Sequence, residues 1–498
     1  MEATYYLAVD LGATSGRTVL AAFDGQCVTM RELTRFKNPQ IPLSGHIYWD
    51  LPHLYNEIII ALQQVAAAGI RLTSIGIDTW GCDVAYFGRD GQLLGLPYCY
   101  RDPHTDGSME RYFDECMPQK ELYARTGIQF MPFNTLFHLD TIRREGGVAL
   151  AEAEKILFMP DALIYMLTGE AVCEQTVAST SQMLNPQTGD LDPDILKTIG
   201  LSRNQFGRMV KPGEQVGVLN AQVQQATGLD AVPVVAVGSH DTASAVAAVP
   251  AEDGNYAYLS CGTWSLLGIE SPTPIINEES FGHNFTNEGG LDGTIRFLKN
   301  ITGLWIFEQC RKEWEKGQWT MDNGQWTMDN GEWTRENGQG TMSIPDDVNE
   351  LNALCLTSAC DSLINPDDPR FAHPASMTAA ICEALTETGQ PLPQSPADYV
   401  RVIFRSLAAR YAEIVAILRR IAPVDIQRLH VIGGGSRNEY LMQFAADALQ
   451  MPVIAGPQEG TALGNALVQV RTAGLVGSLA EMRAIIARSI ELRTYIPS

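Results

Sequence analysis

The sequence has few basic residues, no long apolar run and no leader pattern at its start, and each absence excludes a class of protein. Its 35 Lys and Arg stand against 58 Asp and Glu, for a net charge of −23. Nucleic acids and anionic membranes require a basic surface, so neither is an expected partner. No run of about 18 uncharged apolar residues predicts a transmembrane helix, and MEATYYLAVD lacks the basic and apolar segments of a secretory signal. We therefore expect a cytoplasmic protein.

Cysteines and glycines also lack familiar patterns. The ten cysteines form no C-x-x-C pair, so we expect reduced, mostly buried thiols and no zinc site. The loop G-x-x-x-x-G-K-[ST] is missing, which excludes a P-loop. No G-x-G-x-x-G follows a predicted strand, which leaves a dinucleotide-binding fold unsupported. Any nucleotide site in this chain must therefore use a different phosphate-binding structure.

Two strand pairs with similar turns divide the 498 residues into halves. Apolar residues predict strands at 5–10 and 17–23 in the first half, and at 255–260 and 265–270 in the second. Predicted helices and further strands follow each pair. This organisation indicates an α/β fold with two related domains and a boundary near 251–254. The predicted domains are 1–250 and 251–498.

A seven-residue repeat interrupts the second half at 317–342, with the units GQWTMDN, GQWTMDN and GEWTREN. Each unit contains glycine and one large aromatic residue, whereas a coiled-coil heptad needs two apolar positions, so a coiled coil is excluded. Such polar units cannot offset the entropy lost on ordering, and we expect a mobile surface loop outside the active site with no part in the chemistry. If the Asn-Gly dipeptides form hairpin turns, Trp319, Trp326 and Trp333 would form a short ladder.

Asp241 lies where a predicted buried strand at 232–237 passes into a helix that begins at Thr242. A carboxylate at such a junction is in the usual place for chemistry in α/β proteins. The alternative is that Asp241 only caps the helix, since Asp is among the preferred capping residues. His240 likewise has an alternative, as a hydrogen-bonding residue beside a buried acid rather than a ligand contact.

The turns of the two strand pairs carry small and hydroxyl residues. Backbone N–H groups in such turns can form an anion-binding concavity, and Ser or Thr hydroxyls add donors, so the two turns together can grip a nucleoside triphosphate. The alternative is that both are plain turns, as most glycine hairpins are. The residues are Asp10, Thr14, Ser15 and Arg17 in the first turn, and Gly262, Thr263 and Ser265 in the second.

Two further groups would complete a phosphoryl-transfer site. The triplet Gly433–Gly435, between a predicted strand and helix, either admits a flat ring or phosphate or is a plain tight turn. A hydroxyl that attacks a terminal phosphoryl group needs a carboxylate to take its proton and a metal to neutralise the phosphates. Asp241 would supply the base, and Asp10 would act with Mg²⁺.

Eight segments along the chain match one known family, in that family's order: VDLGATSGR (9–17), GIDTWGCD (76–83), GLPYCYRDPHTDG (95–107), GSHDTASAV (238–246), YLSCGTWSL (258–266), TNEGG (286–290), LKNITGLW (298–305) and HVIGGGSRN (430–438). They strongly resemble the rhamnulokinases, sugar kinases of the FGGY family. The match spans nearly the whole chain, and the combination is far more specific than any single turn.

The resemblance implies two ribonuclease-H-like domains of the actin-like ATPase superfamily that close on ATP and sugar. It implies transfer of the γ-phosphoryl group of ATP to the C1 hydroxyl of L-rhamnulose in rhamnose catabolism, with Mg²⁺. The alternatives are a kinase for a related ketose, such as L-fuculose or D-xylulose, and a non-catalytic sugar- or ATP-binding protein. The presence of Asp10, Asp241 and both turns argues against the non-catalytic alternative. For the oligomeric state, a monomer and a weak dimer both stay open.

The resemblance also implies roles for individual residues. Asp241 is similar to the catalytic base of the family, and Asp10 to the acid that places Mg²⁺ through water. The implied ATP contacts are Ala13, Thr14, Ser15, Gly16, Arg17, Thr263, Glu308 and Gly434. The implied sugar contacts are Gly81, His240, Asp241, Thr242 and Asn300. Glu308 departs from the family, which has glutamine there; its carboxylate would repel a triphosphate but can accept bonds from a ribose hydroxyl or an adenine amino group.

Overall fold

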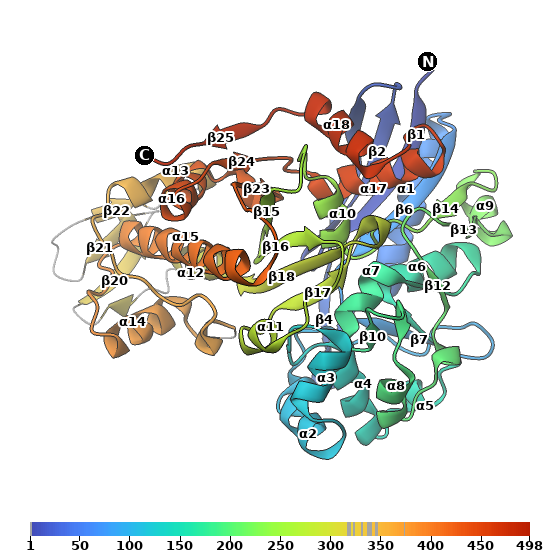
Figure 1. Ribbon diagram of the computed structural model, residues 1–498, viewed down its shortest axis with the longest axis horizontal. Helices are drawn as coiled ribbons and strands as arrows, with labels where there is room; N and C mark the ends of the chain where they lie inside the picture. Colours follow the sequence, from blue (N-terminus) through green and yellow to red (C-terminus); the bar gives the residue numbers. More distant parts are fainter. Residues whose placement is uncertain are drawn as a thin grey trace. The chain divides into compact units, whose positions relative to one another are not determined.

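The computed structural model describes residues 2–315, 320–321, 324–329, 332–335, 341–343, 347–372 and 374–498 (Figure 1). The chain divides into two compact units. Unit 1 comprises Met1–Gly254, Ile269–Leu298 and Glu459–Glu491, and unit 2 comprises Asn255–Gly268, Lys299–Gln458 and Leu492–Ser498. Two segments from the second half of the sequence thus belong to unit 1, and the predicted boundary near 251–254 stays a prediction.

Two expectations from composition can be compared with the structure. Every one of the ten cysteines lies within the described residues and is a free thiol, most of them buried, as predicted. Within the described ranges, the helices are all too short or too polar to cross a membrane.

The centre of unit 1 is a six-stranded sheet with the order β13-β14-β6-β1-β2-β3. Its strands are β1 (Thr4–Leu11), β2 (Ser15–Phe23), β3 (Val28–Lys37), β6 (Leu72–Thr79), β13 (Gln215–Val218) and β14 (Pro233–Val235). Strands β1 and β2 form an antiparallel hairpin, whereas β1 and β14 both pair in parallel with β6. The strand pair predicted at 5–10 and 17–23 is therefore confirmed.

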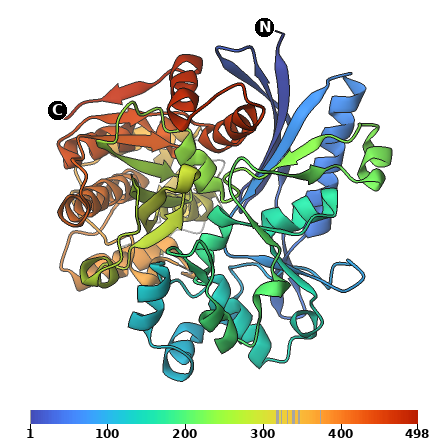
Figure 2. The same ribbon diagram turned by 45° about the vertical axis from the view of Figure 1, so that its right-hand side comes forward.

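Both faces of this sheet are buried because successive side chains of a strand point to opposite faces. Leu7 and Val9 of β1 pack in one core with helices α1 (Leu51–Ala67) and α6 (Met159–Thr168). Tyr6 and Ala8 pack in a second core with α17 (Gly460–Thr472) and α18 (Leu479–Ser489). Figures 1 and 2 show the red helices α17 and α18 beside the dark blue strands. Because both faces are covered by apolar cores, we expect polar side chains that act on a ligand to lie at the ends of the strands.

The remaining elements of unit 1 are short. Its other helices are α2 (Ser108–Glu115), α3 (Gln119–Thr126), α4 (Thr135–Arg144), α5 (Val148–Ala151), α7 (Gln175–Ala178), α8 (Pro193–Thr198), α9 (Ala221–Thr227), α10 (Asp241–Ala247) and α11 (Glu278–Gly282). Its other strand pairs are β4 (Gln40–Leu43) with β5 (His46–Trp49), β7 (Val84–Phe87) with β8 (Lys155–Phe158), β9 (Val172–Glu174) with β12 (Arg208–Val210), β10 (Leu184–Asn185) with β11 (Asp190–Leu191), and β17 (Thr286–Gly289) with β18 (Ile295–Thr302).

In unit 2, the strands follow the order β16-β15-β23-β24-β25. They are β15 (Tyr256–Cys261), β16 (Trp264–Ser271), β23 (Arg428–Ile432), β24 (Val453–Ala455) and β25 (Arg493–Tyr495). Its helices are α12 (Trp305–Glu315), α13 (Val348–Ala353), α14 (Met377–Glu387), α15 (Pro396–Ile421) and α16 (Glu439–Leu449). The hairpin of β15 and β16 confirms the second predicted strand pair, and β15 runs parallel to β23 as β1 runs parallel to β6.

The seven-residue repeat at 317–342 contributes the short strands β19 (Thr320–Met321), β20 (Gly324–Asp329), β21 (Glu332–Arg335) and β22 (Thr341–Ser343), each antiparallel to the next. Trp326 pairs with Arg335, and Trp333 pairs with Met328 and Met342, so these two tryptophans are not direct cross-strand partners. Trp319 lies outside the described residues, as do several of the residues on which the prediction of a mobile loop depends.

Candidate active site

Parallel strands of the unit 1 sheet bring acidic and histidine residues to one edge. Asp10 at the end of β1 is the register partner of Asp78 at the end of β6. Thr79, the last residue of β6, forms a parallel bridge with His240, which lies between β14 and α10. Because the carboxyl ends of parallel neighbours meet at one edge, Asp10, Asp78 and the 240–241 stretch converge there, which is the common site of chemistry in such sheets.

Asp241 is the first residue of α10, and the N-cap of this helix is His240, without a side-chain capping bond. Asp241 Oδ1 accepts hydrogen bonds from the Thr242 N–H at 2.5 Å and from the Thr242 hydroxyl at 3.0 Å. The interpretation of Asp241 as the N-cap is therefore wrong, although its carboxylate does satisfy one free helical N–H. The side chain is 30 % exposed, which leaves the carboxylate accessible to a ligand.

The surroundings of Asp241 make its carboxylate more basic. Burial raises its pKa above the ordinary value, the nearby Asp10 raises it further, and His240 lowers it. A carboxylate with a raised pKa is a stronger base and accepts a proton more readily near neutral pH. This arrangement suits proton abstraction from a neutral hydroxyl group.

His240 is held in one orientation by a buried ion pair. Arg296 Nη2 lies 3.1 Å from His240 Nδ1, and Glu288 Oε2 lies 3.1 Å from the same arginine nitrogen. The Glu288 oxygen is also 3.3 Å from His240 Nδ1, so the ion pair holds the ring at Nδ1, while Nε2 lies 3.5 Å from Asp241 Oδ1. Burial by itself would raise the pKa of Glu288, but Arg296 and His240 outweigh it, and this pKa lies below the ordinary value.

The first of the two turns predicted to bind phosphate joins β1 to β2. The Gly12 N–H donates to Ser15 O at 3.0 Å, which closes the turn around Ala13 and Thr14, and Asn38 N–H donates to Thr14 O at 3.1 Å. Gly16 is required by packing, since a Cβ there would overlap the rings and methyl groups of neighbouring side chains. The backbone of the turn is thereby fixed before any ligand binds.

Arg17 makes a second connection within this turn. Its Nε and Nη2 both donate to Asp10 Oδ2, at 2.9 and 2.6 Å, and its Nη1 forms an ion pair with Glu459. Glu459 precedes helix α17, so Arg17 joins the end of β1 to the start of that helix. The structure thus places Arg17 on Asp10, the candidate Mg²⁺ acid.

Asp78 was missed in the sequence analysis. It is fully buried, and its Oδ2 accepts a hydrogen bond from Asn465 Nδ2 of α17 at 2.6 Å. Burial, followed by the charge of Asp10, raises the pKa of Asp78 well above its ordinary value. The signal that could have found it is an apolar strand that ends in an aspartate, AVD at Asp10 and GID at Asp78. No comparable sequence pattern marks Glu288 or Arg296.

Gly81, the remaining sugar-contact candidate of unit 1 besides 240–242, follows β6. A Cβ on Gly81 would lie 2.8 Å from Thr180 Oγ1, and the next N–H, that of Cys82, donates to the same hydroxyl at 3.2 Å. Close packing against Thr180 therefore favours glycine, whatever its role toward a ligand.

Unit 2 carries the other candidates. Thr263 lies in the turn between β15 and β16, and its carbonyl accepts from the Trp305 N–H at 3.1 Å. Asn300 lies on β18. Glu308, on α12, is 37 % exposed and pairs with Arg311 at 2.8 Å, so its charge is partly compensated by a neighbour on the same helix.

The glycine triplet of unit 2 packs against the end of β15. Gly433 has a φ of +87°, which favours glycine, and its N–H donates to Pro457 O at 3.0 Å. A Cβ on Gly435 would overlap Cys261 Sγ. A Cβ on Gly434 would have no neighbouring atom within 4 Å. Local packing therefore explains the glycines at 433 and 435, whereas Gly434 is the member with open space beside it.

Two family models and several known proteins match the sequence of this chain. The N-terminal domain model of the FGGY family of carbohydrate kinases matches residues 5–248, and the C-terminal domain model matches residues 257–473. The chain is 50 % identical over 495 residues to a rhamnulokinase of Bacteroides thetaiotaomicron, covering 99 % of this chain and 96 % of that protein. It is 40 % identical over 497 residues to a rhamnulokinase of Pectobacterium atrosepticum, covering 99 % and 92 %.

Solved structures agree on the fold. A gluconate kinase from Lactobacillus acidophilus superposes with a TM-score of 0.77 at 14 % identity, covering 100 % of this chain and 94 % of that one. A xylulose kinase from the same organism gives a TM-score of 0.77 at 15 % identity, covering 99 % and 94 %. This likeness confirms the predicted α/β fold of a sugar kinase. From the two family models and these relatives, the chain belongs to the FGGY family of carbohydrate kinases.

Proposed function

We propose that this chain transfers the γ-phosphoryl group of ATP to the C1 hydroxyl of L-rhamnulose, in the catabolism of L-rhamnose. The observation that carries the choice of sugar is the 50 % identity to a rhamnulokinase over 99 % of the chain. The proposal includes a cytoplasmic location and leaves a monomer or a weak dimer to be decided by measurement.

In the proposed reaction, Asp241 is the general base. The C1 oxygen of the sugar forms a bond to the γ-phosphorus as the bond from that phosphorus to the bridging oxygen breaks, and ADP leaves. The hydroxyl proton passes to the Asp241 carboxylate, whose accessibility and raised pKa support this role. His240 Nε2, 3.5 Å from Asp241 Oδ1, keeps that carboxylate oriented.

We assign the sugar and the nucleotide to separate sets of residues. The proposed sugar contacts are Gly81, His240, Asp241, Thr242 and Asn300. The proposed ATP contacts are Ala13, Thr14, Ser15, Gly16, Arg17, Thr263, Glu308 and Gly434. The compensated charge of Glu308 supports a contact with ribose or the adenine amino group rather than with phosphate.

Asp10 is the proposed acid for Mg²⁺. Its carboxylate is of the hard oxygen type that this ion prefers and would hold the hydrated ion through water. Arg17 donates to Oδ2 of this carboxylate. When bound, Mg²⁺ neutralises charge on the phosphate oxygens. The role of this chain is to hold Asp10 in place, through Arg17 on one side and the parallel register with β6 on the other.

The experiment that tests the function is an acceptor comparison. Purified protein with Mg-ATP is assayed for ADP release with L-rhamnulose, L-fuculose, D-xylulose, L-ribulose and glycerol. We expect the highest kcat/KM with L-rhamnulose. A clear preference for another acceptor would assign the chain to a related ketose, and the lack of turnover with every acceptor would indicate a binding protein instead of a kinase.

A further inference from the structure

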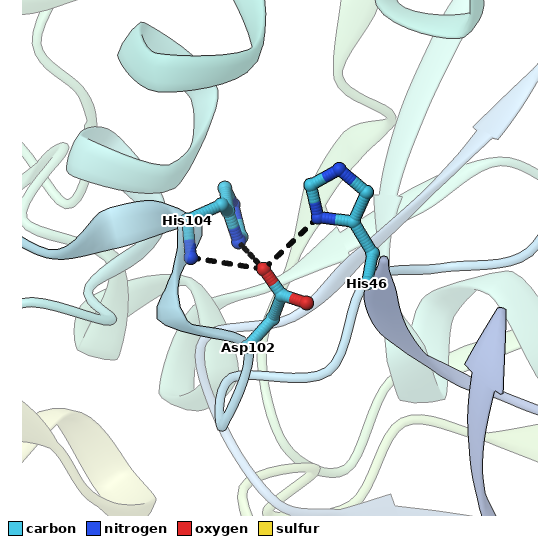
Figure 3. Close-up of side chains that lie close together, drawn as sticks. All are labelled: His46, Asp102 and His104. Atoms are coloured by element: carbon cyan, nitrogen blue, oxygen red, sulfur yellow. Dashed lines mark hydrogen bonds and ion pairs between the residues drawn. The ribbon is translucent and has the colours of Figure 1, made fainter. Parts of the chain in front are cut away.

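A cluster of histidines lies on a different group of elements from the proposed catalytic residues. His46 is the first residue of β5, and Asp102 and His104 flank the start of the short 3₁₀ helix η1 (Pro103–Thr105). Asp102 Oδ1 lies 3.2 Å from His46 Nδ1 and 2.6 Å from His104 Nδ1 (Figure 3). The three possible ligand atoms all lie within 4.8 Å of one another. We propose that His46, Asp102 and His104 bind one divalent transition-metal ion, with Zn²⁺ as the preferred occupant.

The donor set has the composition of a zinc site. Two imidazole nitrogens and one carboxylate oxygen are typical zinc ligands, and a site with three protein ligands keeps a fourth position for water. Ligand bonds of about 2.0–2.1 Å in a tetrahedral arrangement separate the ligand atoms by roughly 3.3 Å. The 3.2 Å between His46 Nδ1 and Asp102 Oδ1 already fits this separation, whereas the 2.6 Å between Asp102 Oδ1 and His104 Nδ1 must lengthen on binding.

The surroundings hold the ligands in place, as outer-shell partners do in metal sites. His104 Nε2 lies 2.9 Å from Nδ1 of the buried His138, and Asp102 Oδ2 accepts from the Ile47 N–H at 2.6 Å. At 2.6 Å only a proton fits between His104 Nδ1 and Asp102 Oδ1, so a metal ion would displace that proton as it binds.

The cluster is open to solvent on one side. His46 is 33 % exposed, whereas the other two ligands are buried, so an ion can reach the cluster from the side of His46.

An ion here would fasten β5 to the segment that contains η1. These segments already share two hydrogen bonds, from Trp49 N to Pro97 O and from Cys99 N to Ile47 O, both at 2.8 Å. Trp49 Nε1 and the Tyr100 N–H both donate to Asp83 Oδ2, at 2.6 and 3.3 Å, two residues beyond Gly81. The ion therefore stabilises the scaffold next to a proposed sugar contact rather than taking part in the reaction.

The test uses full-length protein without a histidine tag, freed of metal with a chelator and kept without ATP. Zn²⁺ is titrated in competition with a chromophoric chelator, and Co²⁺ is titrated while its visible absorption is recorded. We expect one ion per chain, and His46→Ala should weaken the binding by at least about tenfold, since even outer-shell changes have effects of that size. His53→Ala is the matched control, because His53 is 31 % exposed and lies outside the cluster.

Thiols also bind Zn²⁺, and the comparison with His46→Ala separates them because both proteins have the same ten cysteines. Excess Zn²⁺ should raise the unfolding midpoint of the wild type and of His53→Ala, but not that of His46→Ala. If His46→Ala does not fold, His46→Asn keeps a polar group beside Asp102 and replaces it. Equal Zn²⁺ affinity in the wild type and the His46 variant, or the lack of saturable binding in the wild type, would overturn the proposal.

Discussion

His240 Nε2 lies 3.5 Å from Asp241 Oδ1, while Nδ1 of the same ring lies 3.1 Å from Nη2 of the buried Arg296. The two residues are adjacent in the sequence, yet the histidine is held by groups far along the chain. Glu288 and Arg296 belong to β17 and β18, and Arg296 is fully buried. Arg296 and Glu288 hold the ring of His240 at Nδ1. The position of the proposed base, Asp241, therefore depends on an ion pair that does not itself contact Asp241.

Replacement of Asp241 by Asn should lower kcat by about 10²–10⁴-fold, the usual contribution of a general base. Nucleotide affinity, measured by equilibrium titration with ADP, should change little, since the proposed ATP contacts are other groups. Asp50→Asn is the matched control, because Asp50 is a true N-cap that accepts from His53 N at 2.9 Å, where Asn caps equally well. Near-normal turnover in Asp241→Asn would leave it as a helix-end residue only.

Substitution of His240 should move the acid limb of the pH profile. The proposed base must be ionised, so kcat/KM falls as the pH falls through the pKa of Asp241, which burial raises above 3.8. His240 lowers that pKa. In His240→Asn this influence is lost, and the acid limb of kcat/KM should shift to higher pH. A limb that stays in place, or moves to lower pH, would contradict the assignment of this limb to Asp241.

Removal of the guanidinium at Arg296 should destabilise the fold. In Arg296→Met the buried Glu288 carboxylate loses its partner, and breaking a buried ion pair costs about 3–5 kcal/mol. Arg296 holds the pKa of Glu288 below its ordinary 4.5, so the stability it contributes is present above about that pH and is lost as the pH falls through the folded-state pKa.

The loss of unfolding free energy in Arg296→Met should therefore be larger at pH 7 than near pH 4, as measured by urea titration. The double variant Glu288→Gln/Arg296→Met should recover part of the loss, because no buried charge remains. Equal losses at both pH values would mean that the arginine stabilises only by packing.

Gly464 of α17 should not tolerate a methyl group. A Cβ there would overlap the carbonyl oxygen of Ser244, which belongs to α10, the helix that begins with Asp241. Overpacking of this kind costs about 1–3 kcal/mol. Gly464→Ala should therefore lower the unfolding midpoint, by about 2–4 °C per kcal/mol, and also lower kcat. Gly254→Ala is the control, since a Cβ at Gly254 meets nothing within 4 Å and should leave both values unchanged.

Deletion of residues 317–337, three repeat units, should leave kcat and both KM values within about threefold, which corresponds to roughly 0.65 kcal/mol of transition-state free energy. The repeat contains none of the proposed catalytic or ligand-contact residues, and the length of a surface loop has a small entropic effect, about 0.6 kcal/mol per doubling. Steady-state kinetics with ATP and L-rhamnulose provide the measurement. A specific rise in the KM for ATP would show that the repeat contacts the nucleotide.

Much of the local structure follows from the sequence alone. Strands β1 and β2 and the strand-to-helix junction at Asp241 were predicted, because each depends on residues within a few positions of one another. The family motifs, read along the chain, also indicated the fold that the comparisons confirm. Even at Asp241, however, the capping interpretation was wrong, since the sequence does not show that the helix begins one residue earlier, with His240 as its cap.

Contacts between distant segments were decided only by the tertiary structure. Asp78 is an ordinary strand end in the sequence, and only the parallel register of β1 and β6 makes it the neighbour of Asp10. The cysteine pattern argued against a zinc site, yet the fold brings His46 of β5 to Asp102 and His104. Periodicity and local motifs report on neighbours along the chain, whereas burial and ion pairing depend on which strands and loops the fold places side by side.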